Sequence, residues 1–335
     1  MRKLSKQTRY ADVFFQLTRR HLLVFFKNKI RVMYTLLVPV IIFAVYVLFL
    51  RDMELLTVEN TLLKMGIEAD ETLYKHVCTL VDSWMLSGIT ALSTITVALQ
   101  TNSVFVEDKQ NGVNRDFASS PIHRNVLIGS YFLFNFLVTA AICFVFLLIC
   151  ALYLGLMGEF VLTFANVLTI FAVLLFTTVV STLMTIFICT FVKTEATMAS
   201  IVAVFSTAMG FLIGAYMPLG MLPHWVQNFC AFIPGTYSCS LLRYSFMGTP
   251  LNLLSDHVIN VMQIENGAEL IAELSGSFGY QLNFFGLTVN PQFQSLALGV
   301  FLIIFLVLNI VSGKKLADVL GGAKKKIRFK KKSAK

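Results

Sequence analysis

The sequence predicts an all-α integral membrane protein with six transmembrane helices, an N-terminal interfacial helix and a re-entrant element between helices five and six. The first observation is composition: the 335 residues are 57% hydrophobic and only 13% charged, whereas a soluble domain carries about 25% charged residues. The second is the presence of six long apolar runs. The third is the concentration of Lys and Arg near both ends of the chain. Lipid is therefore the expected solvent for most of the chain.

Each of the six apolar runs is long enough to cross the hydrocarbon core, which takes about 20 residues in a helix. Backbone polar groups in lipid must be satisfied within their own segment, so we expect helices. Runs of this length are unlike the alternating segments of a membrane barrel, which are about ten residues each. Pro39 is a candidate kink in the first run. The predicted spans are residues 32–50, 79–99, 126–154, 167–191, 196–217 and 295–311.

Basic residues predict the orientation of the chain. Residues 1–31 contain nine Lys or Arg and one acid, and residues 312–335 contain ten and one. The segment 51–78 has three basic and six acidic residues, and 218–294 has one and four. Because cytoplasmic segments carry the excess of Lys and Arg, we expect a multi-pass protein of the cell membrane with both termini in the cytoplasm. The loops 51–78 and 218–294 are then outside, and the loop 100–125 is inside.

The two basic ends lie directly beside the predicted membrane domain, which covers residues 32–311. In residues 1–31, apolar side chains alternate with Arg19, Arg20, Lys27 and Lys29. This pattern is typical of an amphipathic helix in the cytoplasmic interface. Such a helix either transmits force from a cytoplasmic partner or is a passive anchor. The cytoplasmic tail 312–335 is expected to bind anionic lipid, and we assign the basic charge to topology and lipid rather than to nucleic acid.

The inside loop contains a polar segment, residues 107–124, that is a candidate contact for a partner. Gly112 and Pro121 punctuate it and leave room for a short helix over 113–119. A plain solvated linker is the alternative. The candidate contact residues, an apolar anchor and two charges, are Phe117, Arg115 and Asp116.

The region after the fifth span is apolar but interrupted by Pro218, Pro223 and Pro234. Neither piece is long enough to span the membrane, so we predict re-entrant or interfacial helices, with an ordinary outside loop as the alternative. Aromatic side chains suited to the headgroup level follow at Trp225, Tyr237 and Tyr244. Cys230 and Cys239 also lie here, and a disulfide between them remains open.

Two further features stand inside the spans. Gly210-Phe-Leu-Ile-Gly214 is a small-xxx-small pair that permits close helix approach, including a contact between subunits. Asp82, near the outer end of the second span, is a candidate for the transport pathway or a hydrated interfacial group. Rows of Ser and Thr in the second and fourth spans either line a polar path or bond to carbonyls and neighbouring helices.

Motifs for catalysis are missing from the sequence. It contains no G-x-x-x-x-G-K-[ST] phosphate loop, no H-E-x-x-H and no G-x-S-x-G. The cysteine spacing is not that of a metal site. The chain is therefore not expected to be an enzyme or to hold a metal or cofactor, and active transport would need energy from another chain.

Taken in order, these features resemble the ABC-2 family of transporter permeases over nearly the whole chain. The likeness begins with the basic amphipathic helix and Pro39, and continues with Gly112 followed nine residues later by Pro121. Asp108 matches one of the acids that the family has before this glycine, whereas Gln110 and Asn111 depart from the pattern. The most specific residues of the likeness, in the predicted re-entrant element, are Pro218, Pro223, Trp225, Pro234, Tyr237, Arg243 and Gly248.

The resemblance implies a homodimer or heterodimer of permeases with two cytoplasmic ABC ATPase subunits, which bind ATP and Mg²⁺. It implies that spans one and five face the second permease, in keeping with Gly210 and Gly214. The expected function is ATP-driven export of an amphipathic substrate, such as a drug, a peptide or a lipid-linked molecule. The alternatives are a polysaccharide exporter of the same fold and a channel or immunity protein without an ATPase. The residues implied to contact the ATPase are Arg19, Arg20, Asp108, Gly112, Arg115, Asp116, Phe117, Pro121 and Arg124.

Overall fold

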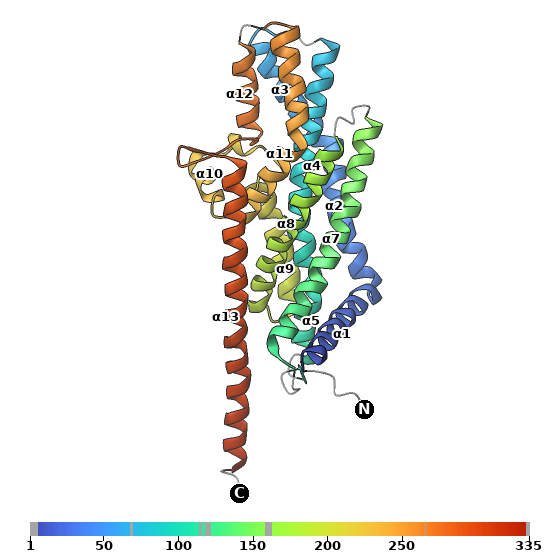
Figure 1. Cartoon of the computed structure of the whole chain (residues 1–335), viewed down its shortest axis with the longest axis vertical. Coiled ribbons are helices and arrows are strands. Elements are labelled where there is room, and N and C mark those ends of the chain that lie inside the picture. Colours follow the sequence, from blue (N-terminus) through green and yellow to red (C-terminus); the bar gives the residue numbers. More distant parts are fainter. Residues whose placement is uncertain are drawn as a thin grey trace.

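In the described part of the chain, the regular elements are helices apart from one short hairpin (Figure 1). The structure, a computed structural model, describes residues 6–67, 70–113, 116–117, 122–157, 163–264 and 266–332. The α-helices are α1 (Lys6–Lys27), α2 (Lys29–Val45), α3 (Arg51–Lys64), α4 (Glu71–Thr101), α5 (Ser103–Gln110), α7 (Arg124–Leu156), α8 (Phe164–Phe191), α9 (Glu195–Leu212), α10 (His224–Cys230), α11 (Pro234–Asp256), α12 (Gly267–Ser277) and α13 (Pro291–Lys332). The shorter elements are the π-helix η1 (Tyr46–Leu50), the 3-10 helix η2 (Leu219–Met221), the π-helix η3 (His257–Val261) and the antiparallel strands β1 (Leu282–Phe284) and β2 (Leu287–Val289).

Six helical segments in the described part of the chain are long and apolar enough to cross a membrane, as predicted. Each contains or overlaps one of the six predicted spans. They are Lys29–Lys64, Glu71–Gln110, Asn125–Leu156, Phe164–Phe191, Glu195–Leu212 and Pro291–Ser312. The described part of the chain therefore has the six candidate membrane-spanning helices that its hydrophobic pattern predicts.

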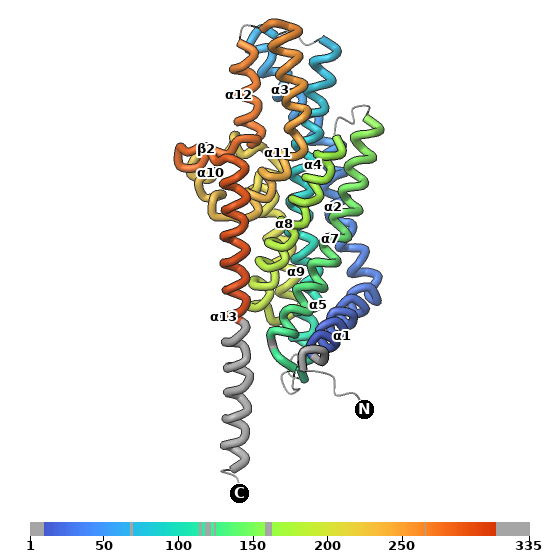
Figure 2. The backbone as a smooth tube through the Cα atoms, in the orientation of Figure 1, coloured from blue at the N-terminus to red at the C-terminus, as the bar shows by residue number. Residues whose placement is uncertain are grey.

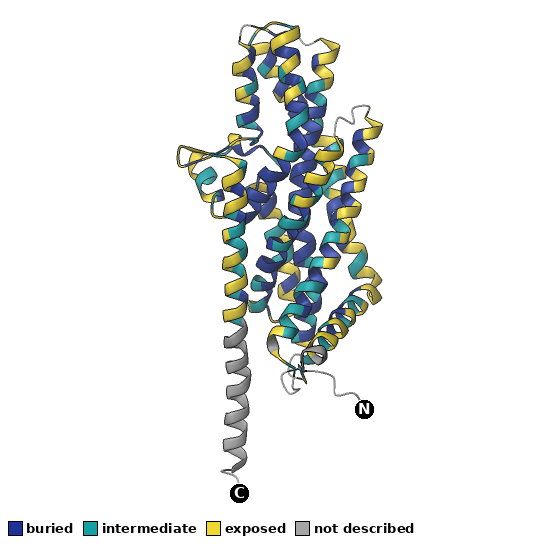
Figure 3. Cartoon of the chain, viewed as in Figure 1, coloured by how far each residue is buried: buried dark blue, intermediate teal, exposed yellow. Residues whose placement is uncertain are grey.

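Helix α4 is the centre of the bundle, and the other long helices surround it. In its most apolar window 89% of the residues are buried, compared with 17% for α2 and α9 and 11% for α13. Figure 3 shows the same contrast: α4 is mostly dark, whereas the described part of α13 is mainly yellow and teal. Apolar side chains on α2, α9 and α13 thus remain uncovered within this chain and are available to lipid or to another protein.

The segment 51–78, expected as a loop, is instead mostly helical. Helix α2 continues through Pro39 and the π-helix η1 into α3, and α4 begins only seven residues after α3 ends. Leu55, Val58 and Leu62 recur at spacings of three and four, and they are buried against the apolar face of α4. Together with α12 and the last turns of α11, these helices form the end of the bundle opposite α1 and α5 (Figures 1 and 2).

The fifth span ends at Leu212 rather than at residue 217, because a glycine cap closes the helix. Gly214 adopts a left-handed φ of +75°. The amide of Ala215 donates to the Gly210 carbonyl at 2.9 Å, and that of Gly214 donates to the Phe211 carbonyl at 3.1 Å. This is the Schellman arrangement, in which glycine is favoured at the left-handed position.

The cap also corrects the expectation that Gly210 and Gly214 form a helix-contact pair between subunits. Gly214 lies beyond the helix, so the two residues do not share a helical face. A Cβ on Gly210 would lie 2.0 Å from the Tyr216 ring, and a Cβ on Gly214 would lie 2.6 Å from the Leu219 side chain. Both glycines are buried against their own chain, where they make room for the turn that follows.

Pro223 and Pro234, which divide the apolar region after the fifth span, each stand at the start of a helix. Pro223 is the N-cap of α10, and Pro234 is at the first position of α11, where its fixed φ suits a helix.

Cys230 and Cys239 are buried free thiols, so the disulfide left open from the sequence is not formed. The last helix, α13, continues past residue 311 into the segment expected as a tail.

Candidate coupling site

The last four residues of α5 each bind a different part of the chain, and we call them the α5 clasp: Glu107, Asp108, Lys109 and Gln110. Helix α5 lies at the same end of the bundle as α1, within the loop expected to contact a partner (Figure 1). Successive side chains on a helix point about 100° apart, so four consecutive polar residues reach four directions. The clasp therefore gathers several elements at one point.

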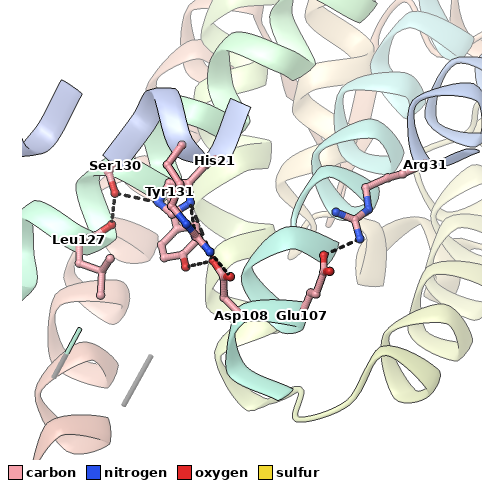
Figure 4. A network of polar contacts seen from close by, with 8 residues as sticks. His21, Arg31, Glu107, Asp108, Leu127, Ser130 and Tyr131 are labelled. Atoms are coloured by element: carbon pink, nitrogen blue, oxygen red, sulfur yellow. Dashed lines mark hydrogen bonds and ion pairs between the residues drawn. The ribbon is translucent and has the colours of Figure 1, made fainter. Parts of the chain in front are cut away.

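Asp108 binds α1 and α7 together (Figure 4). Arg20 donates through Nη1 to Oδ2 at 2.5 Å and through Nη2 to Oδ1 at 2.7 Å. The Tyr131 hydroxyl, from α7, donates to Oδ2 at 2.6 Å. Asp108 is only 4% exposed, and the two-pronged guanidinium contact is the strong form of this interaction. Asp108 is thus an internal tie rather than a surface residue.

His21 extends this contact from α1 to α7 as a neutral side chain. It is fully buried, its Nε2 lies 3.2 Å from the Ser130 hydroxyl, and its ring stacks on Tyr131 at 3.9 Å. Burial, followed by the neighbouring charge of Arg20, lowers the pKa of His21 to about 4. The hydrogen bond to Asp108 raises the pKa of Arg20. At neutral pH this group of side chains therefore contains one cation (Arg20), one anion (Asp108) and the uncharged imidazole of His21.

Glu107 and Gln110 bind the starts of two spans. Arg31, in the first turn of α2, donates from Nη2 to Glu107 Oε2 at 2.7 Å (Figure 4). The side-chain oxygen of Gln110 accepts the backbone N–H of Glu195, the first residue of α9, at 2.7 Å. The first amides of a helix have no partner within the helix, so this contact satisfies one of them.

Lys109 closes the end of α8. Its Nζ donates to the carbonyls of Cys189, Thr190 and Val192 at 3.0, 2.8 and 2.5 Å. Carbonyls at the end of a helix have no intrahelical partner, and a cation there is also favoured by the helix dipole. Since an ammonium group has three donors, Lys109 is matched to three carbonyls. The α8–α9 connection is thereby held on both sides by α5.

The segment after the clasp is described only in part. Gly112 has a left-handed φ of +77° and ends α5. Residues 113, 116 and 117 are helical, within the short helix expected over 113–119. The Arg20 guanidinium lies 5.5 Å from the Phe117 ring centroid, and Asp116 is exposed. Arg115, Pro121 and the side chain of Arg124 lie outside the described residues.

Sequence reasoning singled out Asp108 and Arg20 but missed most of their partners. Arg19 is exposed, while Arg20, the next residue, turns to the clasp. A usable signal was present in α1, where Leu17, His21 and Phe25 recur at spacings of four and are all buried. The missed residues are His21, Arg31, Glu107, Lys109, Gln110 and Tyr131.

Asp82 is on α4, away from the clasp. It lies beside Arg51, the first residue of α3. It is buried, and Arg51 donates to its two carboxylate oxygens at 2.8 and 3.2 Å. The Tyr153 hydroxyl lies 3.4 Å away. Asp82 is therefore an ion-paired core residue, and its part in a transport pathway stays a prediction.

The hydroxyl rows of the second and fourth spans are used in helix packing. On α4, Thr90 and Ser93 donate to carbonyls four residues earlier at 2.6 and 2.7 Å. Between helices, the hydroxyls of Thr94 and Ser181 lie 3.0 Å apart, and Asn102 donates to Thr185 at 2.9 Å. These bonds join α4 to α8, which favours the packing interpretation over a polar path.

The residues expected to form a re-entrant element are spread over η2, α10 and α11. Trp225 is 75% exposed, whereas the Tyr237 hydroxyl donates to the Ala231 carbonyl at 2.8 Å. Pro218 precedes η2, and a Cβ on Gly248 would lie 3.7 Å from the Tyr280 hydroxyl. Arg243 is fully buried in the middle of α11.

A bundle of six membrane-length helices, with a polar clasp at one end that joins α1 to the spans, is the architecture of a multi-pass α-helical membrane protein. Residues 12–247, more than two thirds of the chain, match the family described as ABC-2 type transporter. The chain therefore belongs to the ABC-2 type transporter family, in which it is the membrane permease and not the ATPase. A comparison with curated proteins gave no significant match.

Proposed function

We propose that the chain is the permease subunit of an ATP-driven exporter. The substrate class that we propose is amphipathic (a drug, a peptide or a lipid-linked molecule), moved out of the cytoplasm or the inner leaflet. Permeases of this family generally pair with an ABC ATPase. ATP and Mg²⁺ would be bound by that partner, and this chain would convert its movement into a change of helix packing.

The α5 clasp is the observation that carries the proposal. Direct hydrogen bonds join four consecutive residues to α1, α2, α8 and α9. Packed helices move as rigid elements, so a displacement of α5 is transmitted to all four at once. A push on one short segment can therefore rearrange the spans together.

We assign the contact with the ATPase to the segment that follows the clasp. Phe117 is half-buried beside Arg20, and Asp116 is exposed. Gly112, Arg115, Pro121 and Arg124 belong to the same segment, and Arg19 presents an exposed charge from α1. Asp108 and Arg20 then act as positioning residues, because they face the interior of the clasp. This division separates residues that touch the ATPase from those that pass on its movement.

In the proposed orientation, α1, α5 and both termini face the cytoplasm. The basic side of α1 would rest at anionic headgroups. Helices α3 and α12 would stand outside, and α10 with the start of α11 would enter the outer leaflet as a re-entrant element. The uncovered apolar faces of α2 and α9 are the surfaces that we assign to a second permease.

Co-purification tests the ATPase contact. Where a neighbouring gene encodes a soluble ATPase with a phosphate loop, that ATPase is the first partner to express with the chain. We expect Phe117→Ala to weaken the association by about tenfold or more, as loss of a central interface anchor does. The matched control is Phe164→Ala, because Phe164 is 84% exposed at the opposite end of α8. Equal co-purification of both variants would contradict the assignment.

The substrate class needs a separate measurement. The permease and ATPase are reconstituted together, and ATP hydrolysis is measured against a small panel of amphipathic compounds, peptides, lipid-linked molecules and oligosaccharides. Stimulation by an amphipathic member is expected. Stimulation by oligosaccharides alone would replace the proposed class with a polysaccharide substrate.

A further inference from the structure

Arg243 is a fully buried arginine without an acidic partner among the described residues. It is 0% exposed, and its Nη2 donates to the carbonyl of Gly214. Its Nε and Nη1 make no hydrogen bond within the part of the chain that the structure describes. An arginine keeps its charge when buried, and an unpaired buried charge is strongly unfavourable. Arg51, by contrast, is paired with Asp82.

The surrounding backbone is shaped to hold the guanidinium of Arg243. Gly214 and Gly279 both adopt a left-handed φ, +75° and +67°. A Cβ on Gly279 would lie 2.7 Å from Arg243 Nη1, and one on Gly214 would lie 3.4 Å from it. The guanidinium carbon lies 5.4 Å from the centroid of the Trp84 ring. The turns at Gly214 and Gly279 and the ring of Trp84 thus enclose the guanidinium group.

Other polar atoms without partners lie on the same face of α11. Thr236, Ser240 and Arg243 are spaced by four and three residues, which places them along one side of the helix. All three are buried, and the hydroxyls of Thr236 and Ser240 have no partner within the described chain. Elsewhere on α11, Ser238 and Ser245 donate to carbonyls four residues earlier, at 3.2 and 3.0 Å. The Trp84 indole N–H, beside Arg243, is also unpartnered in this region.

We infer that Arg243 is the centre of an anion site that takes a phosphate group, either free or on a lipid or lipid-linked molecule. The fork of guanidinium donors matches phosphate oxygens, and nearby hydroxyl and indole donors can complete the shell. The turns at Gly214 and Gly279 cover the guanidinium, so the ligand enters when they separate. A bound phosphate supplies the counter-charge that the described chain lacks.

The position of the site separates it from the clasp. Helix α11 runs antiparallel to α4: Gly235 lies beside Ile95, Arg243 beside Trp84, and His257 within 3.2 Å of Asp70. Arg243 is therefore in the half of the bundle toward α3 and α12. Phosphate binding here needs no ATPase, so it can be tested on the isolated chain, and its outcome is independent of the proposed ATP-driven export.

Trp84 provides a direct readout, since the protein has two tryptophans and the other, Trp225, is largely exposed. The full chain with Trp225→Phe is purified in neutral detergent, and Trp84 fluorescence is followed during three titrations. The probes are sodium phosphate, dioctanoyl phosphatidylglycerol and dioctanoylglycerol, with sodium acetate at matched ionic strength as a further arm. We expect a saturable change with a phosphate-bearing probe and none with dioctanoylglycerol or acetate.

Substitutions in the Trp225→Phe background decide whether Arg243 is responsible. Arg243→Gln is expected to weaken phosphate binding by about tenfold to a hundredfold, the usual effect of losing a charged hydrogen bond. Lys64→Gln, an exposed charge at the end of α3, is the control and is expected to bind like its parent. Ser240→Ala is expected to weaken binding several-fold without touching the charge, which provides a second test if Arg243→Gln fails to fold.

The possible results separate the two sources of phosphate. Saturation with sodium phosphate supports a free anion as ligand, and saturation with phosphatidylglycerol alone supports a lipid headgroup. No response of Trp84 to either probe overturns the inference. An unchanged response in Arg243→Gln, or in Ser240→Ala where Arg243→Gln does not fold, also overturns it, and an equal response to acetate overturns the assignment to phosphate.

Discussion

Arg20 and Asp108 are 88 residues apart in the sequence, yet their side chains form a two-pronged ion pair at 2.5 and 2.7 Å. The pair joins α1, which lies beside the predicted membrane interface, to the clasp that holds the starts of α2 and α9 and the end of α8. Because Tyr131 also donates to Asp108, α7 belongs to the same network. A movement of α1 or α5 therefore reaches most of the bundle through polar contacts.

Asp108→Asn is expected to destabilise the protein by about 1.5–3 kcal/mol, the usual contribution of a hydrogen bond to a charged group. The amide cannot accept from both guanidinium nitrogens and leaves Arg20 without its counter-charge. The unfolding midpoint in detergent is the measurement. Asp52→Asn is the control, because Asp52 is exposed on α3, and an equal effect of the two changes would contradict the role of the pair.

Lys109→Met is expected to loosen the end of α8 and lower stability by about 1–3 kcal/mol, since three carbonyls lose a cationic donor. Hydrogen exchange is expected to quicken at residues 188–195, with little change in α4. Lys193→Met removes an exposed lysine from the same connection and is expected to leave exchange unaltered. Matching exchange rates in the two variants would show that Lys109 is not the cap.

The stability of the permease is expected to fall between pH 7 and pH 5 because of His21. Its pKa is about 4 when folded and 6.5 in the reference state, so the unfolded chain binds more protons in this window. The contribution is therefore present above pH 6.5 and is lost as the pH falls toward 4, and the loss between pH 7 and pH 5 amounts to about 2 kcal/mol. Unfolding midpoints at both pH values, for the protein and for His21→Gln, measure it. A variant that keeps the full pH dependence would exclude His21 as its source.

Arg51 and Asp82 are expected to be energetically coupled. Either Arg51→Met or Asp82→Asn leaves a polar group buried without its partner, whereas the double variant removes both. A double-mutant cycle on the free energy of unfolding is expected to give a coupling of about 1–3 kcal/mol. Strictly additive effects would show that the contact contributes nothing to stability.

Gly214→Ala is expected to cost more than Gly66→Ala, although both glycines have a left-handed φ. The backbone conformation alone costs an alanine about 1–2 kcal/mol at either position. At Gly214 the new methyl group also meets Leu219, which adds about 1–3 kcal/mol of overpacking. Unfolding midpoints compare the two variants, and size-exclusion chromatography follows assembly. Dissociation of a permease dimer by Gly214→Ala, with stability equal to that of Gly66→Ala, would restore the intersubunit interpretation.

The local sequence pattern was sufficient to predict the spans and the turn at Gly112. A continuous apolar run is a property of adjacent residues, and lipid admits few solutions for it, so the six helices and the turn at Gly112 could be predicted. The predicted boundaries were wrong in two places, where contacts with other parts of the chain decide the conformation. Segment 51–78 is mostly helical because Leu55, Val58 and Leu62 find an apolar surface on α4, and the fifth span ends early because Gly214 caps it.

The sequence by itself determined that the chain is a multi-pass membrane protein, which six segments are long and apolar enough to span, and which segments carry charge. Only the tertiary structure decided that Arg20 rather than Arg19 meets Asp108, that Lys109 closes α8, and that Arg243 is buried without an acid among the described residues. The physical reason is that hydrophobic periodicity depends on neighbours within a few turns. Which charge meets which depends on helices brought together from residues far apart in the sequence.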